Sequence, residues 1–354
     1  MTKFHKLKVS DIRKETADCV SVAFDVPASL KEEYKFIQGQ YLTLKLFLAG
    51  EEIRRSYSVC SSPLENEMRV AVKKVQGGKG SIFVNDNLKV GNEIEVMTPM
   101  GGFYSPMNAL HKKKYSLFAG GSGITPMLSI IKTVLQAEPN SSLILFYGNL
   151  NEESTIFKKQ LDELAQKNSS RFKLHYIFDK PTTQVEELYK GIISKEKAKA
   201  LFDKHIIPST DNEFFICGPK PMMDNVRETL EERKIDKARI HIEYFTSSVD
   251  APDKVISPSE KIISQVTVSQ YGIETTFKLS SDGKSILDAA IENGVDAPFA
   301  CKGAVCATCR GKILEGKVHM NKNFALTDSE VAEGFVLTCQ SHPLTPVVKV
   351  DYDI

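Results

Sequence analysis

Four cysteines near the C-terminal end constrain this chain more than any other feature. Cys301, Cys306 and Cys309 follow one another at C-x4-C-x2-C spacing, and Cys339 lies far downstream. Three thiols in so short a segment make the backbone wrap tightly around one centre, and the fourth must return to it from a distant part of the fold. The pattern therefore predicts a compact metal-binding loop closed by a remote ligand.

The spacing of the first three cysteines is the one found in plant-type [2Fe–2S] ferredoxins. Inorganic sulfides carry negative charge and favour backbone N–H donors. Small residues at Gly303, Ala304 and Ala307 let the backbone come close enough to supply them. We therefore predict an iron–sulfur cluster held by Cys301, Cys306, Cys309 and Cys339, and a protein that passes electrons one at a time.

Zinc binding and disulfide formation are the two other uses that such cysteines can have. Structural zinc usually takes two separated short cysteine pairs, whereas this chain has one short pair, a preceding cysteine and a lone distant one. Structural disulfides belong to oxidising compartments, and the N-terminal residues lack the apolar core of a secretory signal. Both alternatives fit the pattern less well than a cluster.

Composition bounds the remaining possibilities. A chain of 354 residues predicts two or three domains, and 42% hydrophobic with 26% charged residues is typical of a globular protein in water. A net charge of +1 gives no support to nucleic-acid binding, and no apolar run is long enough to cross a membrane. Cys19, Cys60 and Cys217 are an odd set, which we interpret as reduced thiols of a cytoplasmic protein.

The first hundred residues show the short runs and turn residues of an antiparallel barrel or sandwich. A short helix is expected at Ser81–Asn87. The expected strands are Ser21–Val26, Tyr41–Phe47, Ser56–Cys60, Met68–Val75 and Glu93–Met97.

From about residue 115 strands alternate with helices, which predicts βαβ units on a parallel sheet. The expected strands are Tyr115–Ala119, Leu143–Tyr147, Lys173–Phe178 and Glu213–Cys217, and the expected helices are Pro126–Leu135, Phe157–Gln166, Tyr189–Lys204 and Met222–Arg233.

A segment rich in Ser and Pro with few apolar residues, at 246–262, predicts a flexible linker. Beyond it we expect strands at Ser264–Ser269 and Glu274–Leu279, and a helix at Ile286–Asn293 that ends at Gly294. The domains are therefore expected at 1–108, 109–245 and 263–354.

The segment Gly120-Gly121-Ser122-Gly123-Ile124-Thr125-Pro126 joins a buried strand to a helix. Glycines allow the tight turn and let a pyrophosphate lie against backbone N–H groups, and the helix N-terminus adds its positive end. Its spacing differs from the Rossmann G-x-G-x-x-G pattern, and taken alone it is also compatible with a purely structural turn.

Two further segments carry polar groups suited to a cofactor. Arg55, Tyr57 and Ser58 lie on one strand and offer a guanidinium that can bind a phosphate, a ring that can stack on a flavin and a hydroxyl. Taken alone, they are also compatible with ordinary exposed strand residues. The Gly78–Ser81 segment opens a helix and is a second candidate phosphate site.

Cys217-Gly218-Pro219 follows a predicted parallel strand, at the end where ligands of such sheets bind. A cysteine there can touch a nicotinamide ring. A lone cysteine at the end of a strand is also a common core residue.

Taken together, these motifs resemble the ferredoxin–NADP reductase superfamily. Arg55–Ser58 matches its R-x-Y-S flavin motif, Gly120–Pro126 its G-G-x-G-I-T-P loop, and Cys217–Pro219 its C-G-P motif. The order of parts resembles the oxygenase-reductase branch, and within it the reductase subunits of phenylacetyl-CoA epoxidases. The resemblance implies an antiparallel flavin-binding β-barrel, a parallel-sheet NAD(P)-binding α/β domain and a C-terminal β-grasp ferredoxin domain.

The resemblance also implies roles for individual residues. Ser58 and Cys217 would act where hydride passes between nicotinamide and flavin. FAD would be bound by Arg55, Tyr57, Ser58, Lys73, Gly80 and Ser81, with Phe245 over a flavin face or packing at the domain boundary. NADPH or NADH would be bound by Gly120, Gly121, Gly123, Thr125, Cys217 and Gly218.

The implied activity is that of an NAD(P)H-dependent oxidoreductase. Electrons would run from NAD(P)H through FAD to the [2Fe–2S] cluster and on to a multicomponent oxygenase, with phenylacetyl-CoA epoxidase as the expected acceptor. A Rieske oxygenase, a hydroxylase or a hybrid-cluster protein are alternative acceptors, and a non-catalytic iron–sulfur module is an alternative of another class. Leu150 stands where the family usually has an arginine after Tyr-Gly-Asn, which weakens the case for strict NADPH preference.

Overall fold

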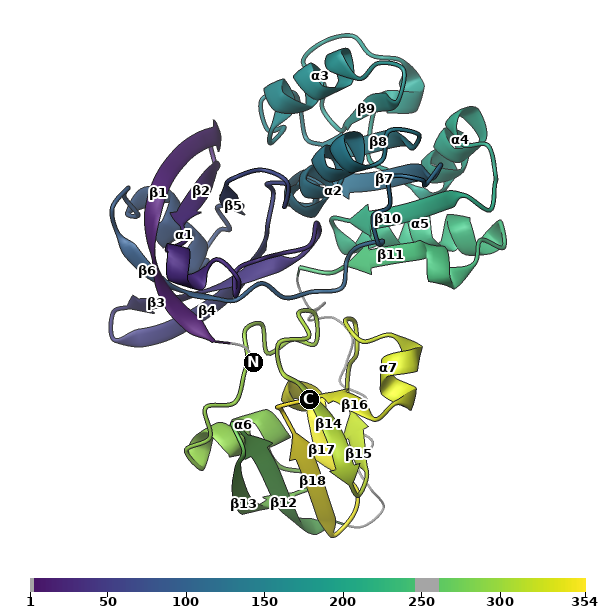
Figure 1. Cartoon of the computed structure of the whole chain (residues 1–354). Coiled ribbons are helices and arrows are strands. Elements are labelled where there is room, and N and C mark those ends of the chain that lie inside the picture. Colours follow the sequence, from purple (N-terminus) through teal and green to yellow (C-terminus); the bar gives the residue numbers. More distant parts are fainter. Residues whose placement is uncertain (1–2, 246–260) are drawn as a thin grey trace. The chain divides into compact units, whose positions relative to one another are not determined.

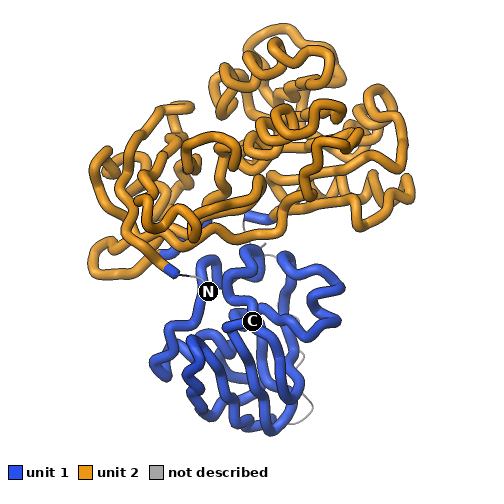
Figure 2. Tube along the Cα trace, in the orientation of Figure 1, with its two compact units in different colours: residues 1–3, 54–56, 244–354 blue, residues 4–53, 57–243 orange. Residues whose placement is uncertain are grey.

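The computed structural model describes residues 3–245 and 261–354. The predicted linker at 246–262 lies almost entirely outside these residues. The chain forms two compact units, one of residues 1–3, 54–56 and 244–354 and one of residues 4–53 and 57–243 (Figure 2). None of the helices in the described ranges combines the length and the apolar character of a membrane span.

The N-terminal part is a six-stranded antiparallel sheet in the order β4-β3-β6-β1-β2-β5 (Figure 1). A bridge between Val59, just after β4, and Val70 in β5 joins the two edges and curls the sheet into a barrel. Inward side chains such as Leu7, Val22 and Leu44 are fully buried in its core. The elements are β1 Phe4–Thr16, β2 Cys19–Asp25, β3 Tyr41–Leu48, β4 Glu51–Ser58, β5 Met68–Lys73, α1 Lys79–Asp86 and β6 Glu93–Met97.

The middle part is a five-stranded parallel sheet in the order β11-β10-β7-β8-β9. β7 is the first strand, and the chain adds β8 and β9 on one side and β10 and β11 on the other. The topology therefore reverses between β7 and β10, which is where ligands of open α/β sheets bind. The strands are β7 Lys114–Gly120, β8 Ser142–Asn149, β9 Phe172–Phe178, β10 Asn212–Cys217 and β11 Ile240–Glu243.

Helices cover both faces of this sheet (Figure 1). One face packs Ile130 of α2 and Leu161 of α3 against Leu117 and Leu145. On the opposite face Phe202 of α4 stacks on Phe214 of β10, with ring centroids 6.2 Å apart. The helices are α2 Ile124–Ala137, α3 Lys158–Lys167, α4 Lys195–His205 and α5 Lys220–Glu232.

The C-terminal part has a mixed five-stranded sheet in the order β13-β12-β18-β14-β16 and a small sheet of β15 and β17. Ile286 and Leu287 of α6 are fully buried in its core. The elements are β12 Ile263–Gln270, β13 Ile273–Ser280, α6 Ile286–Glu292, β14 Arg310–Glu315, β15 Val318–Met320, α7 Asp328–Ala332, β16 Phe335–Leu337, β17 Ser341–Pro343 and β18 Val347–Asp351.

Some predicted boundaries differ from the structure. The helix expected at Tyr189–Lys204 begins only at Lys195, because Gly191 has φ +91° and the Ser194 hydroxyl caps the helix. The strand expected at Ser56–Cys60 overlaps only the end of β4, which begins at Glu51 and stops at Ser58. The strands β1 and β11 and the strands that follow the cysteine loop, β14 to β18, were not predicted.

Candidate functional site

The glycine loop after β7 lies backbone against backbone with the segment after β10. A Cβ at Gly123 would fall 2.1 Å from the Cys217 carbonyl oxygen, and one at Gly120 would fall 2.5 Å from Cδ of Pro219. A Cβ at Gly218 would in turn meet the Gly120 backbone nitrogen at 2.8 Å. The two predicted nucleotide motifs thus meet at the switch point, and each requires glycine in the other.

The turn itself is open at its tip. Gly121 has φ +52°, and no heavy atom lies within 4 Å of the place where its Cβ would stand. The Tyr147 hydroxyl donates a hydrogen bond to the Gly121 carbonyl at 2.9 Å, and the Thr125 hydroxyl donates to the Ser122 carbonyl at 3.1 Å. The hydrogen bonds from Tyr147 and Thr125 hold the loop on one side, and the open space at Gly121 leaves room for a ligand on the other.

Ser58, Glu243 and Cys217 come together from three strands of unit 2. The Ser58 hydroxyl donates to the Glu243 carboxylate at 3.0 Å, and Glu243 pairs with Cys217 across β10 and β11. Burial raises the pKa of Glu243 to about 8. Burial, reinforced by Glu243, raises the pKa of Cys217 well above its ordinary value. The two predicted hydride-transfer residues therefore share one carboxyl group as a neighbour.

Two features of this cluster differ from what the sequence suggests. The Cys217 side chain is fully buried, in the same hydrophobic cluster as Phe103 and Phe215. Glu243 was not among the predicted site residues. The sequence marks Glu243 only by its position at the end of a short strand, directly before Tyr244-Phe245. The pairing of β11 with β10 is what places it beside Cys217.

The predicted flavin residues lie on neighbouring strands of the barrel and on α1. Arg55 is exposed on β4, with one guanidinium nitrogen 2.7 Å from the Arg54 carbonyl, and Tyr57 packs partly against the barrel core. Lys73 ends β5, and its ammonium is 3.6 Å from Asp18.

Gly80 and Ser81 are buried in the first turn of α1. The Ser81 hydroxyl accepts from the Val75 N–H and donates to the Gly78 carbonyl, so it shapes the loop that precedes the helix. Phe245, just after β11, is 40% exposed.

The barrel and α2 are joined by buried hydrogen bonds within unit 2. The Ser129 hydroxyl donates to the Ser61 carbonyl at 2.6 Å, and the hydroxyls of Ser62 and Thr133 are 2.8 Å apart. Buried polar groups paired in this way fix the relative position of the elements that carry them. The strand that carries Ser58 is thereby held beside the helix that follows the glycine loop.

The predicted cluster loop has an unusual backbone. Lys302, Ala304 and Ala307 all have positive φ, at 51°, 64° and 52°, although none of them is glycine. L-residues adopt this conformation at a cost of roughly 1–2 kcal/mol each, so it persists only where the surroundings require it. The Gly303 N–H donates to the Cys301 sulfur at 3.3 Å. This is the arrangement of inward N–H groups that bound sulfur atoms favour.

The thiols of Cys301 and Cys306 form one neighbouring pair, and Cys309 forms a second with Cys339, which lies in the short helix after β16. A hydrogen bond from the Cys306 thiol lowers the pKa of Cys301, and one from the Cys309 thiol lowers the pKa of Cys339. None of the seven cysteines, all of which lie in the described ranges, forms a disulfide bond. In the described ranges, no three His, Cys, Asp or Glu side chains are placed to hold one metal ion. Two thiol pairs fit a two-iron cluster, in which each iron takes two cysteines.

Three protein families match successive parts of the chain. They are the oxidoreductase FAD-binding domain at residues 6–104, the oxidoreductase NAD-binding domain at 117–228 and the 2Fe-2S iron-sulfur cluster binding domain at 268–344. Phthalate dioxygenase reductase, described as a modular structure for electron transfer from pyridine nucleotides to [2Fe-2S], has a TM-score of 0.60 at 25% identity, with 98% of each chain covered. These matches confirm the predicted fold class and the predicted cofactors FAD, NAD(P)H and [2Fe–2S].

Relatives of known name align along the whole chain. One subunit of 1,2-phenylacetyl-CoA epoxidase from Escherichia coli is 43% identical over 100% of this chain and 99% of its own. The ferredoxin reductase component of 3-ketosteroid-9-alpha-monooxygenase from Rhodococcus rhodochrous is 32% identical over 98% of this chain and 96% of its own. The chain therefore belongs to the family of NAD(P)H-dependent, FAD- and [2Fe–2S]-containing reductases that includes these two proteins.

Proposed function

We propose that this protein is the reductase component of a phenylacetyl-CoA epoxidase and passes electrons from NAD(P)H through FAD and the [2Fe–2S] cluster to the oxygenase component. The observation that carries the proposal is the 43% identity to the Escherichia coli epoxidase subunit along the whole of both chains. We place the protein in the cytoplasm and its domain boundaries at 1–108, 109–245 and 263–354, with the linker at 246–262.

The proposal assigns the site residues to three cofactor positions. FAD is bound by Arg55, Tyr57, Ser58, Lys73, Gly80 and Ser81, with Phe245 against a flavin face. The nicotinamide nucleotide is bound by Gly120, Gly121, Gly123, Thr125, Cys217 and Gly218, and the cluster by Cys301, Cys306, Cys309 and Cys339. Bound FAD supplies the conversion of a two-electron hydride into single electrons for the cluster.

The protein itself contributes position and electrostatics. The contact between Gly123 and the Cys217 carbonyl fixes the nucleotide loop against the end of β10. Ser58 and Glu243 offer a hydroxyl and a carboxyl group that is mostly protonated at neutral pH beside the place of hydride transfer. No acid–base pair on the protein is required, because hydride and electrons move between cofactors.

Anaerobic titration of the purified protein with NADH and NADPH separately tests the reductase assignment. We expect either nucleotide to bleach the flavin absorbance and then the cluster absorbance, with one nucleotide acting at lower concentration. A purified protein without flavin absorbance would instead support a non-catalytic iron–sulfur module.

Reconstitution with purified oxygenase components tests the acceptor. With the oxygenase subunits of the Escherichia coli phenylacetyl-CoA epoxidase, we expect NAD(P)H consumption that depends on phenylacetyl-CoA. A Rieske oxygenase with its own substrate serves as the control. Equal rates with both partners, or a higher rate with the control, would show a reductase for a different acceptor.

A further inference from the structure

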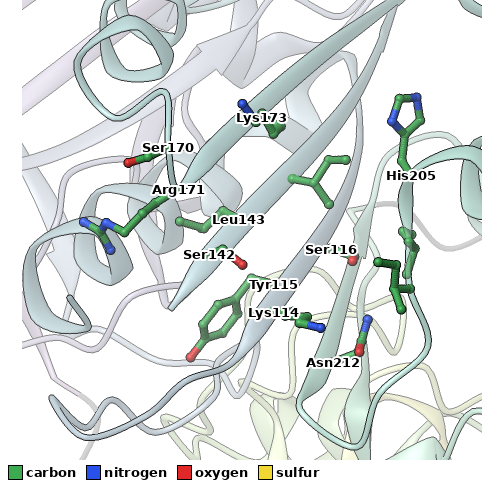
Figure 3. A pocket seen from close by; sticks show the side chains of 13 residues that line it. Lys114, Tyr115, Ser116, Ser142, Leu143, Ser170, Arg171, Lys173, His205 and Asn212 are labelled. Atoms are coloured by element: carbon green, nitrogen blue, oxygen red, sulfur yellow. The ribbon is translucent and has the colours of Figure 1, made fainter. Parts of the chain in front are cut away.

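A cavity of about 240 Å³ opens at the amino-terminal ends of the parallel strands, away from the glycine loop (Figure 3). The strand register places Asn212, Lys114 and Ser142 in one row across β10, β7 and β8. Side chains of one such row point to the same face of the sheet. Lys114 begins β7 and Gly120 ends it, so the cavity and the nucleotide loop are separated by the length of the strand, about 20 Å.

Asn212 is the buried polar group at this cavity. Its side chain is 1% exposed, and its carboxamide oxygen has no hydrogen-bond partner within the described ranges. An unpaired buried polar atom is unfavourable, so the fold retains a group here that no part of the described chain satisfies. The carboxamide carries both an acceptor oxygen and N–H donors, so Asn212 can donate a hydrogen bond to a ligand toward which its side chain turns.

The lining of the cavity is cationic. Lys114 is exposed at its mouth and forms no ion pair with any described residue, and no Asp or Glu lines the cavity. The neighbouring acid, Asp211, accepts a hydrogen bond from the Ser209 hydroxyl at 3.2 Å. The Lys114 ammonium is therefore available to an anionic ligand.

Arg171 and Lys173 contribute less to anion binding than their charges suggest, because both side chains are already hydrogen-bonded to backbone carbonyls. Figure 3 shows the Arg171 side chain on the far side of the strands from Asn212, and its guanidinium donates to the Leu135, Glu138 and Ser141 carbonyls. The Lys173 ammonium donates to the Ser169 carbonyl at 2.7 Å. One free ammonium beside one unpaired carboxamide fits a single carboxylate better than a phosphate, whose higher charge calls for more donors.

One part of the wall is apolar. Ile144 of β8 and Ile206 and Ile207, which follow α4, line the cavity, and Ile207 is 76% exposed. His205 also lines it, with its Nε2 2.8 Å from the Tyr189 hydroxyl. A cavity with a cationic end and a partly apolar wall matches a ligand with one anionic and one apolar part.

We propose that this cavity binds a small organic monocarboxylate with a compact apolar body. Lys114 pairs with the carboxylate, Asn212 donates a hydrogen bond to it, and Ile206 and Ile207 cover the apolar part. The site is distinct from the FAD, nucleotide and cluster sites and does not depend on the identity of the electron acceptor.

Calorimetric titration of the purified holoprotein with sodium benzoate tests this site. We expect saturable binding of one benzoate with a Kd of about 0.1–1 mM. Benzyl alcohol, which lacks the charge, and inorganic phosphate, which lacks the apolar body, are expected to bind at least about tenfold more weakly. The absence of saturable benzoate binding, or tighter binding of phosphate, would overturn the proposal.

Substitutions of the lining residues test whether benzoate binds in this cavity. Lys114→Gln is expected to raise the benzoate Kd about tenfold, because it removes one charge-assisted hydrogen bond. Lys112→Gln, which removes a charge two residues away without touching the lining, should leave the Kd unchanged. Asn212→Asp adds a negative charge beside Lys114 and should abolish binding.

If Asn212→Asp does not fold, the test rests on Lys114→Gln, because a substitution at the exposed Lys114 leaves the core intact. Binding by Lys114→Gln as tight as that of the unaltered protein would locate benzoate elsewhere and refute the site. An equal loss in Lys112→Gln would show a general charge effect and refute it as well.

Discussion

The Ser58 hydroxyl donates a hydrogen bond to the Glu243 carboxylate across 3.0 Å, joining the end of the barrel strand β4 to the last strand of the parallel sheet. The two residues are 185 positions apart in the sequence. Because burial raises the pKa of Glu243 to about 8, the carboxyl group is mostly neutral at pH 7 and ionises in mildly alkaline solution. The site therefore changes its charge within an accessible pH range.

We expect the rate of flavin reduction by NAD(P)H to fall as the pH rises through about 8. Ionised Glu243 places a negative charge beside Ser58 and Cys217, the proposed hydride-transfer residues, and it also destabilises the fold, since the ordinary pKa of a glutamate lies far below 8. Stopped-flow absorbance under anaerobic conditions from pH 6 to about 9.5 measures the rate. Glu243→Gln should remove the alkaline decline, and a decline that persists in Glu243→Gln would assign it to another group.

Cys306→Ala is expected to separate the two halves of the reaction. Without one thiolate the [2Fe–2S] cluster does not assemble, so reduction of a one-electron dye should be lost while NAD(P)H still bleaches the flavin. Cys19→Ala is the control, because Cys19 is a buried thiol on the barrel strand β2, outside the cysteine loop. A Cys306→Ala protein that reduces one-electron acceptors at the normal rate would disprove the relay.

Tyr147→Phe is expected to weaken nucleotide binding without removing the nucleotide loop. The Tyr147 hydroxyl holds the Gly121 carbonyl at 2.9 Å, and losing one such bond costs about 1 kcal/mol, which corresponds to a roughly fivefold higher KM. Tyr176→Phe is the matched control, since its hydroxyl donates to Asp162, away from the loop. Steady-state kinetics should show a raised KM in Tyr147→Phe alone, and equal changes in both variants would indicate a general loss of stability.

Leu150→Arg tests nucleotide preference. Leu150 is 50% exposed just beyond β8, so a larger side chain is tolerated there. A guanidinium at this position is expected to lower the KM for NADPH about tenfold through a charge-assisted bond to the extra phosphate, and to leave the KM for NADH unchanged. Leu150→Gln, which adds length without charge, is the control. An equal effect on both nucleotides would place Leu150 away from that phosphate.

The nucleotide domain is expected to lose stability in acid through His175. Burial lowers the pKa of His175 to about 4, and His205, whose ring centroid is 4.2 Å away, opposes its protonation further. A folded-state pKa below the ordinary 6.5 means that the contribution of His175 is complete above pH 6.5 and is lost as the pH falls towards 4. Urea unfolding at pH 7 and 5 should show a smaller loss in His175→Leu, and an identical loss would exclude this histidine.

The sequence predicted the cofactors and the order of the domains because each rests on local motifs. The C-x4-C-x2-C spacing and the Gly120–Pro126 loop are continuous segments, so their chemistry can be read without the fold. Glu243 could not be assigned in this way, because it reaches Ser58 and Cys217 only through strand pairing. Asn212 is another such residue, since its unpaired oxygen depends on the packing of three strands and a helix end.

The errors in secondary structure also have local causes. Residues 190–194 continue a helical pattern, but the left-handed Gly191 and the Ser194 cap delay α4 to Lys195. The strand β1 alternates apolar residues with many charged ones, so its pattern gives only a weak strand signal, although the barrel buries Leu7 and Val9 completely. In both cases a tertiary contact or a single backbone angle outweighed the local pattern.

The left-handed backbone at Lys302, Ala304 and Ala307 has a consequence for how the protein matures. Three non-glycine residues in this conformation together cost roughly 3–6 kcal/mol, a sum comparable to the net stability of a small domain. Ligation of iron by the four proposed cysteine ligands would be the interaction best able to offset it. A newly synthesised chain would then complete its C-terminal part only once iron and sulfide are delivered, so the supply of assembled clusters would set the yield of functional protein in the cell.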